Sequence, residues 1–374
     1  MIVAGSALTL FLAGDVMTGR GIDQVLPHPC DPALREPYVL DAREYVALAE
    51  EVSGDIPRPV PPAYPWGDAL DELERVAPAA RIVNLETSIT RSDAFWPGKG
   101  VHYRTSPENA ECLRAAKLDG CVLANNHVID FGRAGLVETL ETLDRLSIAH
   151  AGAGRTIEEA TAPAVLDRGE LGRVLVFAVG SPSAGVPRAW EAAAGVPGVW
   201  LAPDLSGRTV RRIRDAIERH ARPRDVVVLS IHWGPNWGYG VGDDERAFAR
   251  AVIDEAGAHV VHGHSSHHVK GIELYRGRLV LYGCGDLLTD YEGIRGYERF
   301  RGDLGLMYFA TVDVGTGRLI ALEMVPTRMR RFRITRASGD DAAWLGRVMR
   351  RECEMLGAEV EQERDGRLFL RGDR

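Results

Sequence analysis

Side chains able to bind metal or move protons stand at the ends of apolar runs along the chain. The runs end in carboxylate, amide or imidazole groups, namely Asp15, Glu86, Asn126, His127, His232, His264 and Asp286. In open α/β sheets, ligands bind beyond the carboxyl ends of the strands. Taken singly, Asp15 could cap a helix, Asn126 could be a turn residue and Glu86 could be a solvated loop acid. Their repetition from run to run predicts a common site.

Histidines are concentrated in one short segment. Five of the 11 histidines fall within His259–His268. Burying such an imidazole cluster without partners is costly, so metal coordination or acid–base chemistry would explain it. The alternative is an exposed His-rich loop. We expect His264 and His267 to be functional and His259 and His262 to be structural. Mixed oxygen and nitrogen ligands without thiolate suit a hard or borderline divalent ion.

A second histidine, His127, has an acid three residues further on, at Asp130. An imidazole beside a metal site can shuttle protons, and a carboxylate can fix its tautomer. The spacing lets Asp130 reach His127 on one helical turn. The alternative is that Asp130 caps a helix that begins near Gly132.

The elements that would position these residues alternate between two patterns. Continuous apolar runs predict strands covered on both faces at Leu8–Ala13, Ala80–Leu85, Gly120–Ala124, Arg173–Val179, Asp225–Ile231, Ala258–Val261 and Arg278–Tyr282. Apolar residues at three- and four-residue spacing predict helices at Ala69–Val76, Pro107–Lys117, Leu136–Leu146, Thr209–His220 and Glu245–Glu255. This alternation predicts an α/β fold.

We expect one catalytic domain over residues 1–330, with a C-terminal helix and hairpin over 331–374 packed on it. The Pro-rich segment 27–65 is expected to be an insertion with a helix near Asp41–Val52. It could lie at the mouth of the site or be a mere surface loop.

Composition narrows the class of protein. The chain has 374 residues and a formal net charge of −8, and an acidic surface repels phosphate backbones, so nucleic acid is not expected as a partner. Five cysteines without a C-x-x-C pair indicate a reducing compartment. Ile2 to Gly14 is interpreted as a buried strand rather than a signal segment, and no membrane span is expected. The expectation is a cytoplasmic enzyme; the sequence does not predict its oligomeric state.

Short motifs occur in a characteristic order. They are Gly14-Asp15-Val16-Met17, Asn84-Leu85-Glu86, Ala124-Asn125-Asn126-His127 with Asp130-Phe131-Gly132, His232-Trp233-Gly234, Gly263-His264 with His267, and Tyr282-Gly283 with Gly285-Asp286. Over about Leu8 to Asp286 the chain resembles the CapA-type (poly-γ-glutamate capsule synthesis) family of the calcineurin-like metallophosphatase superfamily. The resemblance implies an α/β sandwich of two central sheets flanked by helices, with a metal centre at one sheet edge.

The resemblance also implies roles for single residues. Metal ligands would be the carboxylates Asp15 and Glu86, the Asn126 amide and the imidazoles His232, His264 and His267, with His127 as acid or base. Three departures stand out: Met17 replaces an expected histidine, Asn84-Leu85-Glu86 replaces an Asp-containing block, and the last His pair is stretched by one residue. Losing ligands on one side weakens a two-metal clamp. A single hard ion, Ca²⁺ or Mg²⁺, is therefore favoured, with Mn²⁺ or Zn²⁺ as alternatives.

Three functions are open. CapA-like proteins encoded with lasso peptide clusters include epimerases, so the first hypothesis is a metal-dependent epimerase inverting a Cα centre of a peptide substrate. Its acid–base pairs would be His127 with Asp130, and His264 or His267 with Asp15 or Asp286. The second is a hydrolase of phosphoester or γ-glutamyl bonds. The third is a non-catalytic partner of a polyglutamate ligase. The run Trp233–Tyr239 could line a pocket for a bulky side chain or simply pack.

Overall fold

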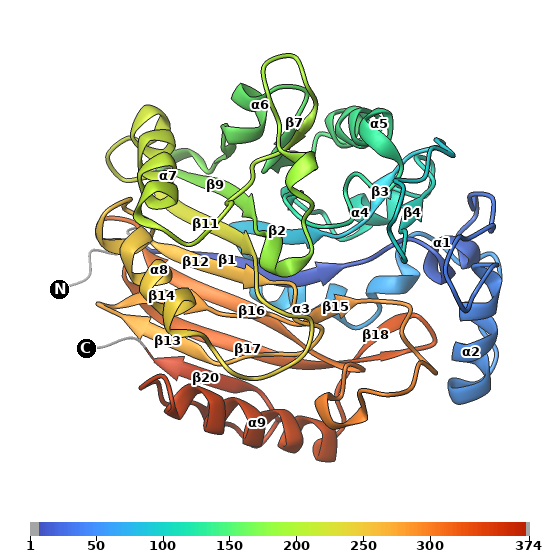
Figure 1. Ribbon diagram of the computed structural model, residues 1–374. Helices are drawn as coiled ribbons and strands as arrows, with labels where there is room; N and C mark the ends of the chain where they lie inside the picture. Colours follow the sequence, from blue (N-terminus) through green and yellow to red (C-terminus); the bar gives the residue numbers. More distant parts are fainter. Residues whose placement is uncertain (1–6, 372–374) are drawn as a thin grey trace.

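The structure, a computed structural model, describes residues 7–371, and over these residues the strands form one ten-stranded and one six-stranded sheet (Figure 1). The ten-stranded sheet has the order β19 (Glu361–Gln362), β20 (Leu368–Arg371), β17 (Leu319–Arg330), β16 (Leu304–Asp313), β1 (Ala7–Val16), β2 (Ala80–Leu85), β5 (Gly120–Val122), β6 (Ala149–Ala151), with β15 (Asp286–Leu288) beside β1 and β18 (Arg333–Arg336) beside β17. The six-stranded sheet has the order β13 (Ile272–Tyr275), β14 (Arg278–Leu281), β12 (Val260–His264), β11 (Val226–His232), β9 (Arg173–Gly180), β8 (Ala164–Asp167). Two small ribbons pair β3 (Ser88–Ile89) with β4 (Arg104–Thr105) and β7 (Ala153–Gly154) with β10 (Gly198–Val199).

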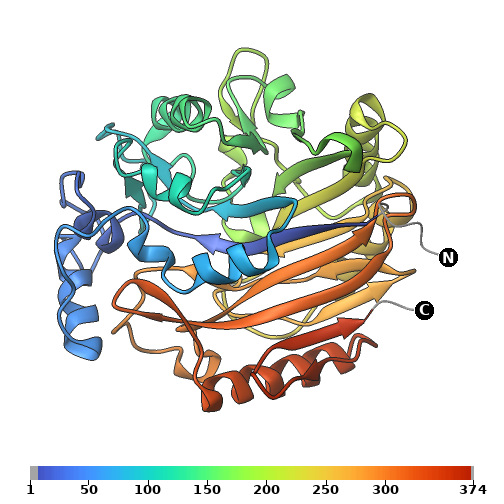
Figure 2. The same ribbon diagram turned by 180° about the vertical axis from the view of Figure 1, so that it is seen from behind.

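The helices lie around the sheets, most of them on the outer faces and the last one against the core between the sheets. They are α1 (Gly21–Val25), α2 (Arg43–Ser53), α3 (Ala69–Val76), α4 (Glu111–Ala115), α5 (Gly132–Arg145), α6 (Ile157–Thr161), α7 (Gly207–His220), α8 (Asp243–Asp254) and α9 (Gly339–Glu354). Buried residues of α3, α4 and α5 pack on the ten-stranded sheet, and those of α7 and α8 pack on the six-stranded sheet. In the reverse view, α9 runs beside β20 and β17 (Figure 2). This is the predicted α/β sandwich of two central sheets flanked by helices.

Strand β1 shows why the predicted runs are apolar without alternation. Leu10 and Leu12 pack in the core between the two sheets, whereas Phe11 and Ala13 pack under the helices on the other face. Successive strand residues point to opposite faces, and both faces of this sheet are covered.

Parallel pairing gathers the strand ends. Strands β1, β2 and β5 are parallel neighbours, and so are β9, β11, β12 and β14. The register places Asp15 beside Asn84 in one sheet and His232 beside His264 in the other. The residues that end these strands therefore meet at one edge of the sandwich.

Asp286 reaches this edge by an unexpected route. The apolar run Arg278–Tyr282 predicts Asp286 at the end of that strand, but β14 ends at Leu281, and the chain then crosses to the other sheet. There Asp286 begins β15, which pairs with β1 where the pairing of β1 with β16 stops. The crossing passes so close to β1 that a Cβ at Gly14 would lie 1.9 Å from the Gly285 carbonyl oxygen, which only glycine allows.

Other boundaries differ by a few residues. The helix predicted at Pro107–Lys117 is limited to Glu111–Ala115, and Lys117 adopts a left-handed φ of 51° that ends it. Helix α2 lies in the Pro-rich segment as predicted, and the predicted C-terminal hairpin forms as β19 and β20. The domain division near residue 330 stays a prediction, and residues 2–6 of the first apolar run lie outside the described part. Within residues 7–371, no helix is long and apolar enough to span a membrane.

Candidate metal centre

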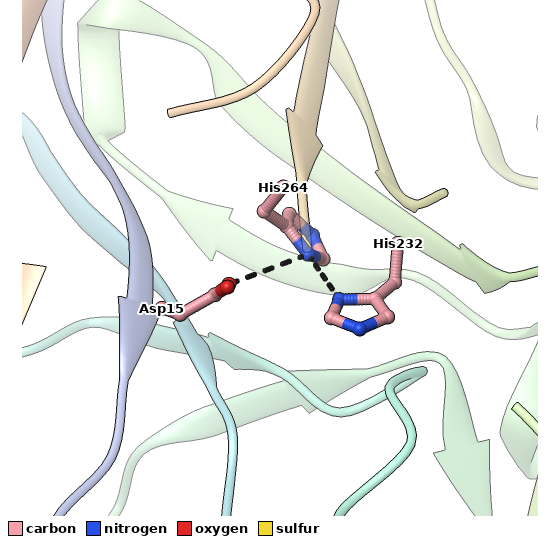
Figure 3. A group of neighbouring side chains, drawn as sticks. All are labelled: Asp15, His232 and His264. Atoms are coloured by element: carbon pink, nitrogen blue, oxygen red, sulfur yellow. Dashed lines mark hydrogen bonds and ion pairs between the residues drawn. The ribbon is translucent and has the colours of Figure 1, made fainter. Parts of the chain in front are cut away.

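Three predicted ligands from both sheets meet at the edge of the sandwich. His264 Nδ1 lies 3.8 Å from Asp15 Oδ1 and 2.9 Å from His232 Nδ1, as Figure 3 shows. One ligand atom of each residue lies within 4.8 Å of the others, and all three side chains are buried. Asp15 comes from β1 of the large sheet, and the two histidines come from β11 and β12 of the small sheet.

Two further predicted ligands border this group. The Asn126 Oδ1 atom lies 2.9 Å from His232 Nε2, and Glu86 Oε1 lies 4.0 Å from the same nitrogen. Glu86 is buried, so it is not a solvated loop acid. The convergence of Asp15, Glu86, Asn126 and the two histidines supplies the oxygen and nitrogen donors that a divalent ion needs.

A second group shares Asp15. Ligand atoms of Asp15, His267 and Asp286 also lie within 4.8 Å of one another, and His267 Nδ1 is 2.9 Å from Asp286 Oδ1. The Nε2 atom of His267 is 3.1 Å from the Asn236 amide. All three members are buried, so His267 and Asp286, one of the pairings left open by the sequence, are brought together inside the protein.

The carboxylates of the centre lack strong cationic partners. Among residues 7–371, the ion pairs of Asp15, Glu86 and Asp286 are all to histidines. Burial, and then the nearby charge of Asp286, raise the pKa of Asp15 to about 7. Burial and the charge of Asp15 raise the pKa of Glu86 well above its usual value. Buried acids in this state need protons or cations to balance their charge.

Burial shifts the pKa values of the imidazoles in the opposite direction. Burial lowers the pKa values of His232 and His264 well below their usual value, and neighbouring histidines add to the effect. Neutral imidazoles keep a lone pair that can bind a metal. His267 differs, because Asp286 outweighs the effect of burial and raises the pKa of His267.

One further observation supports a divalent cation among these residues. The Oδ2 atoms of Asp15 and Asp286 are buried, and neither has a hydrogen-bond partner within the described residues. A buried carboxylate oxygen without a partner is costly. A cation among these groups would satisfy both atoms.

The predicted acid–base pair forms beside the centre. His127 Nδ1 is 2.6 Å from Asp130 Oδ2, and His127 Nε2 is 3.8 Å from Glu86 Oε1. Burial lowers the pKa of His127 to about 4. Asp130 does not cap the following helix, because the residue at the N-cap position of α5 is Phe131.

Lys99 contacts both members of this pair and was not predicted from the sequence. Its ammonium forms an ion pair with Asp130 and lies 2.9 Å from His127 Nδ1. Lys99 lies in a loop between β3 and β4, where no apolar run or spacing marks it. Burial opposes the charged form of Asp130, but His127 and Lys99 outweigh it and lower the pKa of Asp130 below its usual value.

Two asparagines, Asn84 and Asn125, hold the acids of the centre in place. Both occur in the sequence motifs, but no role was predicted for them. Asn84 Nδ2 donates to Asp15 Oδ1 at 2.7 Å and to Glu86 Oε2 at 3.3 Å. Asn125 Nδ2 donates to Asn84 Oδ1 at 3.0 Å. Hydrogen bonds from neighbouring residues to metal ligands orient those ligands and affect metal affinity.

Two other histidines of the same segment, His259 and His262, make contacts that hold the sheets. His262 Nε2 lies 2.9 Å from the Ala13 carbonyl oxygen, which links the two sheets, and His259 Nδ1 accepts from the Val227 amide. His264, His267 and His268 are buried, so this segment is not an exposed loop.

A pocket of about 490 Å³ opens beside His267. Asn236 and Trp237 line it, and Trp237 stacks on Tyr297 at a ring distance of 4.2 Å. Ser53, from the Pro-rich segment, lies on its wall. The run Trp233–Tyr239 therefore has two roles. Asn236 and Trp237 line the pocket, whereas Trp233 is buried in the core, where it stacks on Tyr282.

Fold and site together define an α/β sandwich of the metallophosphatase-like kind with a candidate metal centre at the strand ends. The match to the family described as bacterial capsule synthesis protein PGA_cap covers residues 9–291, and the chain belongs to this family. The predicted CapA-type resemblance is therefore confirmed.

Named relatives cover different shares of the chain. A probable polyglutamine synthesis accessory protein of Mycobacterium tuberculosis (strain H37Rv) is 45% identical over 96% of this chain and 95% of its own length. The PGA biosynthesis protein CapA of Bacillus subtilis is 29% identical over 63% of this chain and 58% of its own length. The capsule biosynthesis protein CapA of Bacillus anthracis is 22% identical over 86% of this chain and 68% of its own length.

The prediction of a peptide epimerase in lasso peptide synthesis is wrong. A relative that matches nearly the whole chain is named as an accessory protein of polyglutamine synthesis, which fits the alternative of a partner in polymer synthesis better. The epimerase hypothesis rested on paired His and Asp residues, and such pairs serve many reactions without naming a substrate.

Proposed function

We propose that this protein is an accessory protein in the synthesis of a glutamyl polymer, and that it acts through a divalent metal ion held by Asp15, Glu86, Asn126, His232 and His264. The single observation that carries the polymer assignment is 45% identity over 96% of the chain to a relative named for polyglutamine synthesis. A metal in the centre is supported by the buried, unpartnered Asp15 Oδ2 atom.

The bound ion would act as a Lewis acid toward a carbonyl or phosphoryl oxygen. The protein's own groups would do the rest. Asn84 orients Asp15 and Glu86, the neutral imidazoles offer lone pairs, and the pocket beside His267 has room for a segment of the polymer. A pocket of a few hundred cubic ångströms suits a small ligand or a chain end.

The test is polymer formation in the host. Deletion of the gene is expected to lower the amount of glutamyl polymer, measured as glutamate after acid hydrolysis of the purified polymer, which also converts glutamine to glutamate. The wild-type gene and an Asp254→Asn control, altered on the surface helix α8, should restore it, and Asp15→Asn should not. An unchanged amount of polymer in the deletion strain would overturn the proposal.

A second candidate is a hydrolase of phosphoester or γ-glutamyl bonds in the same process. The observation that favours it is the His127–Asp130–Lys99 group, whose His127 Nε2 lies 3.8 Å from Glu86 of the centre. A purely structural metal would need no such group. His127 is placed to exchange a proton with a leaving group or water at the centre.

Purified protein supplied with Mn²⁺ and assayed on p-nitrophenyl phosphate and γ-glutamyl-p-nitroanilide tests this candidate. A hydrolase would release p-nitrophenol or p-nitroaniline, and His127→Ala should lower the rate at least ~100-fold, within the range for general acid–base catalysis, while leaving metal content unchanged. Equal rates for the wild type and His127→Ala would exclude a role of this group in hydrolysis.

A further inference from the structure

We infer that the solvent-facing side of helix α7, with the turn that follows it, binds a glutamyl chain that still carries its free carboxylates. The inference rests on the proposed function for the identity of the chain, and it adds a binding surface that takes no part in the metal centre. We call this surface the arginine ridge, and it consists of Arg208, Arg211, Arg212, Arg219, Arg222 and Arg224.

Positive charge is concentrated at the ridge in a chain that is acidic as a whole. Residues 207–224 contain seven arginines and two acids, whereas the chain has a formal net charge of −8. Both acids, Asp215 and Glu218, lie beside Arg214, at 3.0 and 3.8 Å. No ion pair with any of residues 7–371 is formed by Arg211, Arg219, Arg222 or Arg224. Their charge is therefore available to a partner.

Helix α7 turns its arginines outward because its other side is buried. The buried apolar residues recur at three- and four-residue spacing and pack on the six-stranded sheet; they are Val210, Ile213, Ala216 and Ile217. Arg208 and Arg212, four residues apart, follow one another at about 6 Å along the helix axis. Arg219 lies about two turns beyond Arg212 on the same side. The ridge thus presents a row of guanidinium groups along the helix.

A groove of about 790 Å³ lies beside the ridge, with walls from α6 and α7. Arg212 and Arg219 line the α7 wall, and Ile157 and Trp200 contribute apolar surface. Within residues 7–371, Glu158 is the acid of this lining that has no arginine partner. A glutamyl side chain, with methylene groups that end in a carboxylate, matches an apolar surface beside arginines.

The repeat of a glutamyl chain suits the spacing of the ridge. In an extended polypeptide, side chains on one side recur about every 6.7 Å, close to the ~6 Å between helix residues four apart. Guanidinium groups bind carboxylates through paired hydrogen bonds. A single exposed contact contributes little, so several contacts along one chain must act together. Because glutamine carries no charge, the ridge would select the chain before its carboxylates are amidated.

The ridge and the metal centre lie at opposite ends of strand β11. The turn that ends the ridge leads into β11 at Val226, and the centre lies at the other end of this strand, at His232, roughly 20 Å away. Figure 1 shows α7 on the left, away from α1 and α2. A chain bound on the ridge therefore leaves the centre accessible.

Binding of a defined polycarboxylate tests the inference. A fluorescein-labelled chain of about ten glutamates, enough to span α7, is titrated with the protein in a chelator, so that the metal centre plays no part, and anisotropy reports binding. We expect saturable binding that weakens as the salt concentration rises. Arg211→Gln/Arg219→Gln should weaken it roughly 10-fold, and Arg211→Glu/Arg219→Glu should abolish it.

The matched control is Arg330→Gln/Arg347→Gln, which removes two exposed arginines of β17 and α9 and the same amount of charge. It should bind the glutamate chain as the wild type does. Circular dichroism checks the folding of all variants. No binding by the wild type, or equal losses in the ridge and control variants, would overturn the inference.

Other ligands test which partner the ridge selects. A chain of the same length with glutamine at alternate positions should bind more weakly than the glutamate chain. Tighter binding of a single-stranded oligonucleotide of equal charge, or of vesicles containing phosphatidylglycerol, through the same arginines would overturn the assignment to a glutamyl chain. The proposed function fails separately, when deletion of the gene leaves the polymer unchanged. Binding of the glutamate chain that only the ridge variants lose would then still support a polycarboxylate site on α7.

Discussion

The two central sheets bring different chemistry to the same edge. Strands of the ten-stranded sheet end in acids and amides, with Asp15 on β1, Glu86 after β2 and Asp286 on β15. The six-stranded sheet supplies imidazoles, His232 on β11 and His264 on β12. Neither sheet alone presents a complete set of ligands, so packing of the sheets assembles the site.

Burial affects the two sides in opposite ways. It raises the pKa values of Asp15 and Glu86 and lowers those of His232 and His264. The acids would need a cation to become charged, whereas the histidines are neutral and ready to bind one. Changes on the acid side should therefore abolish metal binding, and changes on the imidazole side should alter which metal is preferred.

Asp15→Asn should have the largest effect. It removes the one carboxylate that both ligand groups share, so affinity for Mn²⁺ should fall at least ~1,000-fold, about 4 kcal/mol. Isothermal calorimetry measures this loss, with Asp254→Asn as the control. Wild-type affinity in Asp15→Asn would show that the acid side does not dominate binding.

The pH dependence of metal-free protein should show the cost of burying Asp15. Its pKa is about 7 in the folded protein against 3.8 for an ordinary aspartate. Between these values the unfolded chain binds fewer protons, so this group makes stability fall as pH rises from about 4 to 7. The free energy of unfolding of the wild type relative to Asp15→Asn should fall by on the order of 4 kcal/mol over this range. Urea unfolding in a chelator measures it, and a flat difference would contradict the account.

His264→Gln tests the imidazole side. Imidazole suits Zn²⁺, whereas carboxylate and carbonyl oxygens suit Ca²⁺ and Mn²⁺. Affinity for Zn²⁺ should fall by roughly 30-fold, about 2 kcal/mol, and that for Ca²⁺ should change much less. Competition with a chromophoric chelator compares the ions. An equal loss for all three would mean that this side sets affinity rather than preference.

Asn84→Ala should give the smallest effect on metal binding. It removes the donor to Asp15 and Glu86, and loss of such a contact lowers metal affinity by about 10-fold. Asn109→Ala is the matched control, because Asn109 donates to the buried Asp23 away from the centre. Both variants should lose stability, and only Asn84→Ala should lose affinity; equal affinities would remove Asn84 from the support of the site.

Much of the fold and the site could be predicted because local patterns encode them. Apolar runs covered on both faces give the strands, and the polar residues that end them gather where parallel strands end. The route of Asp286 could not be read, since strand β15 is three residues long and its pairing with β1 is non-local. Lys99 was missed because only the folded chain places its loop beside His127.

Substrate and function were harder to predict than geometry. The sequence paired His127 with Asp130, and His264 or His267 with Asp15 or Asp286. The contacts of His127 with Asp130 and of His267 with Asp286 are present. Neither contact identifies what the site acts on, because the same acid–base pairs serve different reactions. The proposed function rests instead on the name of a relative of similar length.

Anomalous diffraction from crystals of the protein soaked in Mn²⁺ tests the central claim most directly. The account predicts an anomalous peak at bonding distance, about 2.0–2.6 Å, from the side chains of Asp15, His232 and His264. Crystals with full diffraction and no peak among these residues, or with Mn²⁺ bound only elsewhere, would contradict it.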